Sequence, residues 1–157
     1  MIHQQKNNNK MRILSPWQTV LMTAGGMLTV GSAIAMMAAT IATADWLVEV
    51  GMTAPWTFAL GVMAFVSMQL LQRYEGGDFT VARLRRMLII SDICLVVAAL
   101  LMIENVYHFV MPYVAHDLKS MITYLQVVRN NWVVLVLVAA ILQLYATMRL
   151  SSELKKN

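Results

Sequence analysis

Cysteine and charge are both scarce in this chain of 157 residues. A single cysteine, Cys94, excludes a disulfide within the chain, a zinc site built on several thiolates and a redox centre that needs a cysteine pair. Only 13% of the residues are charged and 59% are apolar, whereas soluble domains have about 25% and about 45–50%. This balance excludes a disordered chain or a nucleic-acid-binding tail and indicates a membrane protein, and the length favours a single domain.

Four long apolar runs follow one another along the chain. A helix needs about 20 mostly apolar residues to cross the hydrocarbon core, and lipid admits only helices or closed barrels. The runs lack the alternation of barrel strands, so we expect helices over about 17–44, 55–72, 87–110 and 131–149. The predicted fold class is an all-α, integral membrane four-helix bundle that forms one domain over residues 1–157.

Two further segments fall outside these runs. The Asn-rich start, residues 1–14, predicts a disordered tail. Over about 113–128, apolar residues recur at helical spacing, at Val114, Leu118, Met121, Leu125 and Val128. This segment is too short and too polar to span, so we expect a short interfacial helix on the outer side. It either caps the bundle, or docks a partner's helix or lines an entrance.

The basic residues predict the orientation in the membrane. Ten of the twelve Lys and Arg residues precede the first span, lie between the second and third, or follow the fourth; the other two are Lys119 and Arg129. Positively charged short loops stay in the cytoplasm, so both termini and the middle loop should face the cytosol. Trp46, Trp56 and Trp132 then fall at the outer interface, where amphipathic rings favour the headgroup level.

Asp92 is the most informative residue of the spans. It lies six residues after Arg86, hence about 9 Å inside the inner boundary of a regular helix. Gln69, Gln143 and Arg73 reach the same half of the membrane on other helices, so we expect a polar layer there. An ionised carboxylate in lipid costs about 2.5–3.5 kcal/mol, so Asp92 should face other helices. The layer either fixes helix register, with Asp92 protonated or hydrogen-bonded, or Asp92 changes protonation during proton or cation movement.

A second polar cluster is expected at the outer end of the third span. Glu104 and His108 are four residues apart and would share a helix face, with Arg129 nearby. A metal site needs three or four ligands, and only this pair has suitable spacing. We therefore favour a solvated edge, with Glu104 pairing with Arg129 or Lys119, over a metal site, and expect neither a metal nor a cofactor.

Small residues recur every four positions on the first span, at Gly31, Ala35 and Ala39. Such a stripe lets another helix approach closely. It serves either packing within the bundle, with Gly61 as a candidate counterpart, or contact with a second copy or another membrane protein. The other expected partner is the lipid bilayer, and no nucleic acid is expected.

The stretches LQRYEG, RLRRM and NNWVVLVLVAAILQLYATMR resemble small four-span membrane proteins of Bacteroidota. The resemblance covers most of residues 55–153. No activity is assigned to such proteins, so the resemblance implies none. It does imply a bacterial inner membrane location.

Catalytic motifs are not evident in the sequence. It shows no nucleophile–base pair, metal constellation or cofactor loop, so we expect no enzyme. The small size, the short loops and the small-residue stripe favour a scaffold or accessory subunit of a membrane complex. The alternative is a small oligomeric carrier or channel, coupled to protons or cations, that uses Asp92.

Overall fold

The computed structural model describes residues 15–41, 45–72, 79–114, 116–129 and 131–156. Within these ranges the chain is helical and contains no strand. The helices, in chain order, are α1 (Pro16–Ile41), α2 (Asp45–Leu71), α3 (Phe79–Tyr107), α4 (Met111–Val114), α5 (Leu118–Val128) and α6 (Asn131–Lys156). The tail predicted over 1–14 lies outside the described residues.

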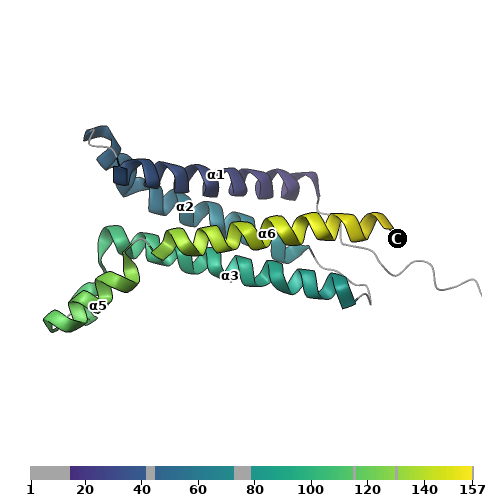
Figure 1. The fold of residues 1–157 in the computed structure, drawn as a ribbon. Helices are drawn as coiled ribbons and strands as arrows, with labels where there is room; N and C mark the ends of the chain where they lie inside the picture. Colours follow the sequence, from purple (N-terminus) through teal and green to yellow (C-terminus); the bar gives the residue numbers. More distant parts are fainter. Residues whose placement is uncertain (1–14, 42–44, 73–78, 115, 130, 157) are drawn as a thin grey trace, which may run out of the picture.

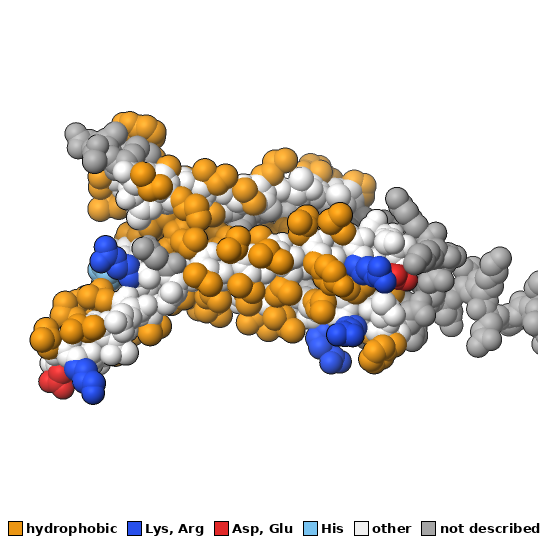
Figure 2. Space-filling view, in the orientation of Figure 1, with side chains coloured by type: hydrophobic (Ala, Val, Ile, Leu, Met, Phe, Trp, Pro, Cys, Tyr) orange, Lys and Arg blue, Asp and Glu red, His pale blue; other side chains and the backbone are white. Residues whose placement is uncertain are grey.

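Four helical stretches are long and apolar enough to cross a membrane: Pro16–Ile41, Val48–Leu71, Phe79–Tyr107 and Leu118–Glu153. The last of these includes α5 together with α6. Figure 2 shows hydrophobic side chains along the length of the bundle and charged side chains near its two ends. The predicted all-α fold with four helices of membrane-spanning character is confirmed.

α2 and α3 begin before the predicted spans and α6 ends after its span, whereas α3 ends at Tyr107, three residues before the predicted end. α2 begins ten residues before Pro55, which lies inside the helix. A helix in lipid tolerates proline where other groups satisfy the carbonyl oxygens of the preceding turn. Pro55 leaves the Gly51 carbonyl oxygen without its helical N–H, and the Tyr107 hydroxyl donates to the next carbonyl oxygen, that of Met52, at 2.9 Å. α3 begins at Phe79, eight residues before the predicted start, because the arginine-bearing turns continue the helix past the apolar run.

The four long helices pack in the order α1–α2–α3–α6 (Figure 1). α1 lies against α2, α3 lies against α6, and α2 contacts α3. In the described part of the chain, no Cα atom of α1 lies within 8 Å of a Cα atom of α6. The bundle is therefore open along one side. α5 diverges from the bundle axis at one end (Figure 1).

Two glycines allow α1 and α2 to approach closely. A Cβ atom added at Gly25 would lie 2.8 Å from the Phe65 backbone nitrogen, and one at Gly61 would lie 2.8 Å from the Thr29 backbone nitrogen. Van der Waals packing drives helix association in lipid, so this backbone contact is the main support of the α1–α2 pair. Ser32 of α1 adds a hydrogen bond to Thr57 of α2.

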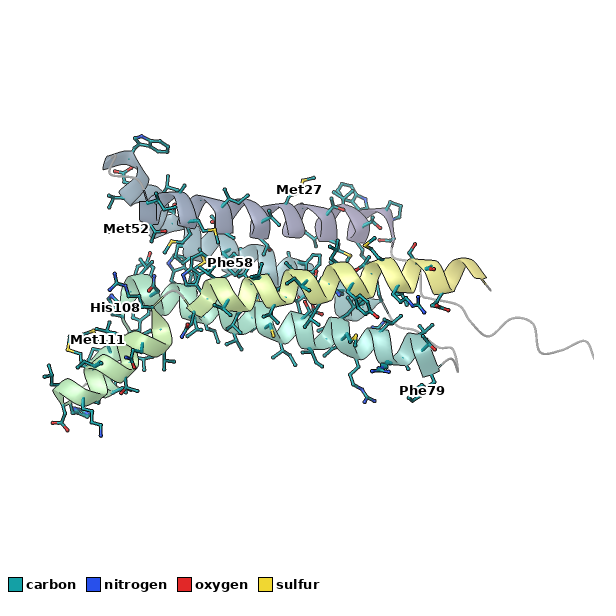
Figure 3. All side chains as sticks on the ribbon, viewed as in Figure 1. Met27, Met52, Phe58, Phe79, His108 and Met111 are labelled. Carbon is teal, nitrogen blue, oxygen red and sulfur yellow. The ribbon has the colours of Figure 1, made fainter. Side chains whose placement is uncertain are left out.

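The core lies among the four long helices, and its fully buried side chains come from α2, α3 and α6. Its fully buried side chains include Phe58 of α2, Met102 of α3, and Trp132 and Ala139 of α6. Figure 3 labels Phe58 near the middle of the molecule, with His108 and Met111 at one end and Phe79 at the other. We refer to the end with His108 and Met111 as the outer end, following the expected orientation.

Candidate functional site

The polar residues of the inner half meet between α3 and α6. Asp92 of α3 is 3% exposed, and its Oδ1 accepts a hydrogen bond of 3.2 Å from Nε2 of Gln143 on α6. One residue earlier, the Ser91 hydroxyl donates to the Ala139 carbonyl oxygen at 2.9 Å. Both bonds join the same two helices. The polar side chains thus hold α3 and α6 in one register, as an unsatisfied group in lipid would cost several kcal/mol.

Gln69 of α2 brings the third helix to this site. Gln69 and Asp92 line one small cavity of about 20 Å³, together with Gln72 and Arg85. A volume of about 10–15 Å³ is enough for a single water. Gln69 Oε1 and Asp92 Oδ2 are buried and have no hydrogen-bond partner in the described part of the chain. Arg73, the fourth residue expected here, lies outside the described residues.

Arg85 was not among the residues expected at this site. It lines the cavity, and its Nη2 atom lies 3.5 Å from the Leu70 carbonyl oxygen. A signal was present in the sequence, because Arg85 precedes Asp92 by seven residues, which is two helical turns on one face. The Arg85 guanidinium reaches α2 at Leu70 and does not form an ion pair with Asp92 among the described residues, although both line the cavity.

The outer cluster is arranged differently from the expectation. Glu104 is 9% exposed, and its Oε1 accepts hydrogen bonds from the Tyr124 hydroxyl of α5 and from the Val110 backbone N–H at 2.9 Å. The carboxylate therefore holds α5, and the turn that comes directly after α3, against the end of α3. The expected ion pair of Glu104 with Arg129 or Lys119 is not formed within the ranges that the structure describes.

His108 does not share a helix face with Glu104. α3 ends at Tyr107, and His108 has a φ of 51°, in the left-handed region that often follows the last turn of a helix. The i,i+4 rule that would bring the two side chains together holds only inside a helix. His108 and Arg129 instead line a common groove at the outer end.

The small-residue stripe is only partly used inside the bundle. A Cβ atom added at Gly31 would meet nothing within 4 Å, whereas one added at Gly51 of α2 would lie 3.3 Å from the Ala39 Cβ atom. Gly31 and Ala35 line a groove of about 390 Å³ along α1 and α2. Gly61 does serve the α1–α2 contact, but against Thr29 and the Gly25 carbonyl oxygen rather than against the stripe.

The described residues thus offer one buried acid hydrogen-bonded to an amide, and no cluster of three metal-ligating side chains. A carboxyl group in such a place can fix a helix interface or exchange a proton. Neither a nucleophile beside a base nor a ligand set for a cofactor is found in the part of the chain that is described. The chain matches no protein-family model, no curated protein and no solved structure.

Proposed function

We propose that this chain is a small multi-pass protein of a bacterial inner membrane that serves as a scaffold or accessory subunit of a membrane complex. The observation that carries the proposal is the groove along α1 and α2 that contains Gly31 and Ala35. Gly31 has open space where a side chain would be. Small residues at a helix surface in lipid allow the backbone of another helix to approach closely.

The polar side chains of the spans support the same proposal. Ser32 donates to Thr57 at 3.0 Å, Ser91 to Ala139, and Gln143 to Asp92, so each joins one helix of the chain to a neighbour. These bonds stabilise the chain itself. They leave apolar and small-residue faces for contact with other membrane components.

Co-purification from native membranes tests this function. We expect a stoichiometric partner, either a second copy or another membrane protein, to accompany the wild-type chain in mild detergent. Gly31→Ile places a branched side chain in the groove and should abolish that association. Ala82→Ile adds nearly as much bulk at an exposed position of α3 and should leave it intact. Absence of any partner, or equal loss in both variants, would contradict the proposal.

Asp92 favours a second function, that of a small oligomeric carrier or channel coupled to protons or cations. The supporting observation is the cavity that Asp92 shares with Gln69 and Arg85, next to two buried acceptor oxygens without partners among the described residues. Protonation of the carboxyl would supply a donor, and ionisation would remove it. Such a group can alternate between two hydrogen-bonding states.

Proteoliposomes with an entrapped pH-sensitive dye separate this function from the first. A carrier would collapse an imposed proton gradient, and Asp92→Asn would abolish that flux while the protein still folds. Glu49→Gln, at an exposed position of α2, is the matched loss of one acid and should have no effect. Equal flux through wild type and Asp92→Asn, or none through either, would exclude the carrier.

A further inference from the structure

A wide groove opens at the outer end of the molecule, between the end of α1 and the ends of α3, α5 and α6. Its volume is about 930 Å³, within the range of about 300–1,000 Å³ that is usual for ligand sites. Its polar lining consists of Thr40, Asn105, His108 and Arg129. We call it the outer groove. Figure 2 shows a basic side chain and a histidine together at this end, and Figure 3 labels His108 there.

The outer groove is cationic and rich in free donors. The side chains of Asn105, His108 and Arg129 have no hydrogen-bond or ion-pair partner among the residues that the structure describes. None of the residues that line the groove is acidic. The nearby carboxylate of Glu104 is buried and already accepts bonds from Tyr124 and Val110. An anion in this groove would therefore meet a guanidinium, an imidazole and an amide, and no acidic side chain among the described residues that line it.

A second, apolar groove continues from the first toward the middle of the bundle. It has a volume of about 470 Å³ and lies between α1 and α6, where the two helices do not approach each other. Ala33 and Ile34 line one side and Ala140 the other, and Met37 lines both grooves. We call it the side groove.

The side groove matches one leaflet in length. Along α1 the side groove is lined from Gly26 to Met37. Eleven residues of helix rise about 16 Å, and half of a hydrocarbon core of about 30 Å is about 15 Å. A cationic, donor-rich end at the outer interface thus leads into an apolar channel one leaflet deep.

We propose that the two grooves together bind one anionic phospholipid of the outer leaflet. The phosphate lies in the outer groove against Arg129, with His108 and Asn105 as further donors, and one acyl chain lies in the side groove between α1 and α6. Arginine suits this role because its planar guanidinium forms paired hydrogen bonds with phosphate oxygens. Along the membrane normal the cationic outer groove comes first and the apolar side groove second, just as the headgroup of a lipid precedes its acyl chain. The inference does not depend on a scaffold or a carrier function.

Lipid binding to the purified, delipidated full chain tests the headgroup. Thermal unfolding in detergent and native mass spectrometry would be recorded with added phosphatidylglycerol, phosphatidylcholine or inorganic phosphate. We expect phosphatidylglycerol to bind and to raise the unfolding temperature more than the other two. Because hydrogen bonds to charged groups are the strong ones, Arg129→Gln should weaken phosphatidylglycerol binding about tenfold or more. Lys119→Gln, the same charge loss at an exposed position of α5 outside both grooves, should not.

A separate variant tests the acyl chain. Ala140→Phe fills the side groove without touching the outer groove, and it should weaken phosphatidylglycerol binding while Arg129 is still present. Any one of four results would overturn the proposal. Phosphatidylcholine could bind as well as phosphatidylglycerol, Lys119→Gln could weaken binding as much as Arg129→Gln, or Ala140→Phe could have no effect. Equal stabilisation by inorganic phosphate alone would likewise overturn it, in favour of a soluble anion.

Discussion

Replacing Gly61 with alanine tests whether the backbone contact between α1 and α2 stabilises the fold. The new Cβ atom would lie 2.8 Å from both the backbone nitrogen and the hydroxyl oxygen of Thr29, and 3.0 Å from the Gly25 carbonyl oxygen. Two of these three atoms are backbone, which cannot rotate away. The helices must therefore separate or shift along one another.

The expected loss follows from a comparison with Gly31→Ala. Both substitutions place alanine inside a helix, so both gain the same helix propensity of about 0.5–1 kcal/mol. Gly31 has nothing within 4 Å of its added Cβ atom, so that variant should be neutral or slightly more stable. The difference between the two variants is then the packing term alone. Overpacking of this kind costs about 1–3 kcal/mol, so Gly61→Ala should unfold more easily than Gly31→Ala by that amount.

The assay is reversible unfolding in mixed micelles, with the helical circular dichroism signal followed as a denaturing detergent is added. The free energy of unfolding of each variant is compared with that of the wild type at the same protein concentration. If Gly61→Ala is as stable as Gly31→Ala, the close approach of α1 and α2 is not what holds this pair together. Equal destabilisation of the two variants would also contradict a specific packing contact at Gly61.

Three further outcomes are expected. Tyr124→Phe removes one donor from the buried Glu104 carboxylate and should cost about 1–3 kcal/mol locally, seen as faster amide hydrogen exchange over α5 with little change in α1. Asp92→Leu leaves the Gln143 amide without its partner and should lower the free energy of unfolding by about 1 kcal/mol or more. Asp92→Asn keeps an acceptor oxygen and should lower it less. Equal losses in the two variants would refute a stabilising role of the Gln143–Asp92 hydrogen bond. In a background without Cys94, the Arg83→Cys variant should react with a membrane-impermeant maleimide only after the cells are opened. Labelling of that variant in intact cells would show that the orientation is opposite to the expected one.

The sequence predicts the helices well because their signal is local. Apolar runs without charge leave the backbone no solution in lipid other than a helix, so the number of spans follows from composition. Their ends are less predictable. α2 continues through Pro55, and its turn before the proline receives a hydrogen bond from Tyr107, a residue distant in the sequence, to the Met52 carbonyl oxygen.

The contacts of Asp92 could be predicted from the sequence, whereas those of Glu104 could not. Depth along each helix, which is counted in residues, brings Asp92 and Gln143 to one level, and the structure joins them by a hydrogen bond. The hydrogen-bond partners of Glu104 do not follow from residue spacing along a helix. They depend on where α3 ends and on how α5 folds back, and both are set by the left-handed turn at His108.

The pairing of α3 with α6 has a consequence for biosynthesis. A chain emerges from the ribosome N-terminus first, so α1 and α2 can associate as soon as both are inserted. Asp92 and Ser91 must wait until the last helix arrives, because their partners Gln143 and Ala139 are about 50 residues downstream. Until then, α3 exposes an acid to lipid or to the insertion machinery. Truncation before α6 should therefore leave a nascent protein that quality-control proteases remove.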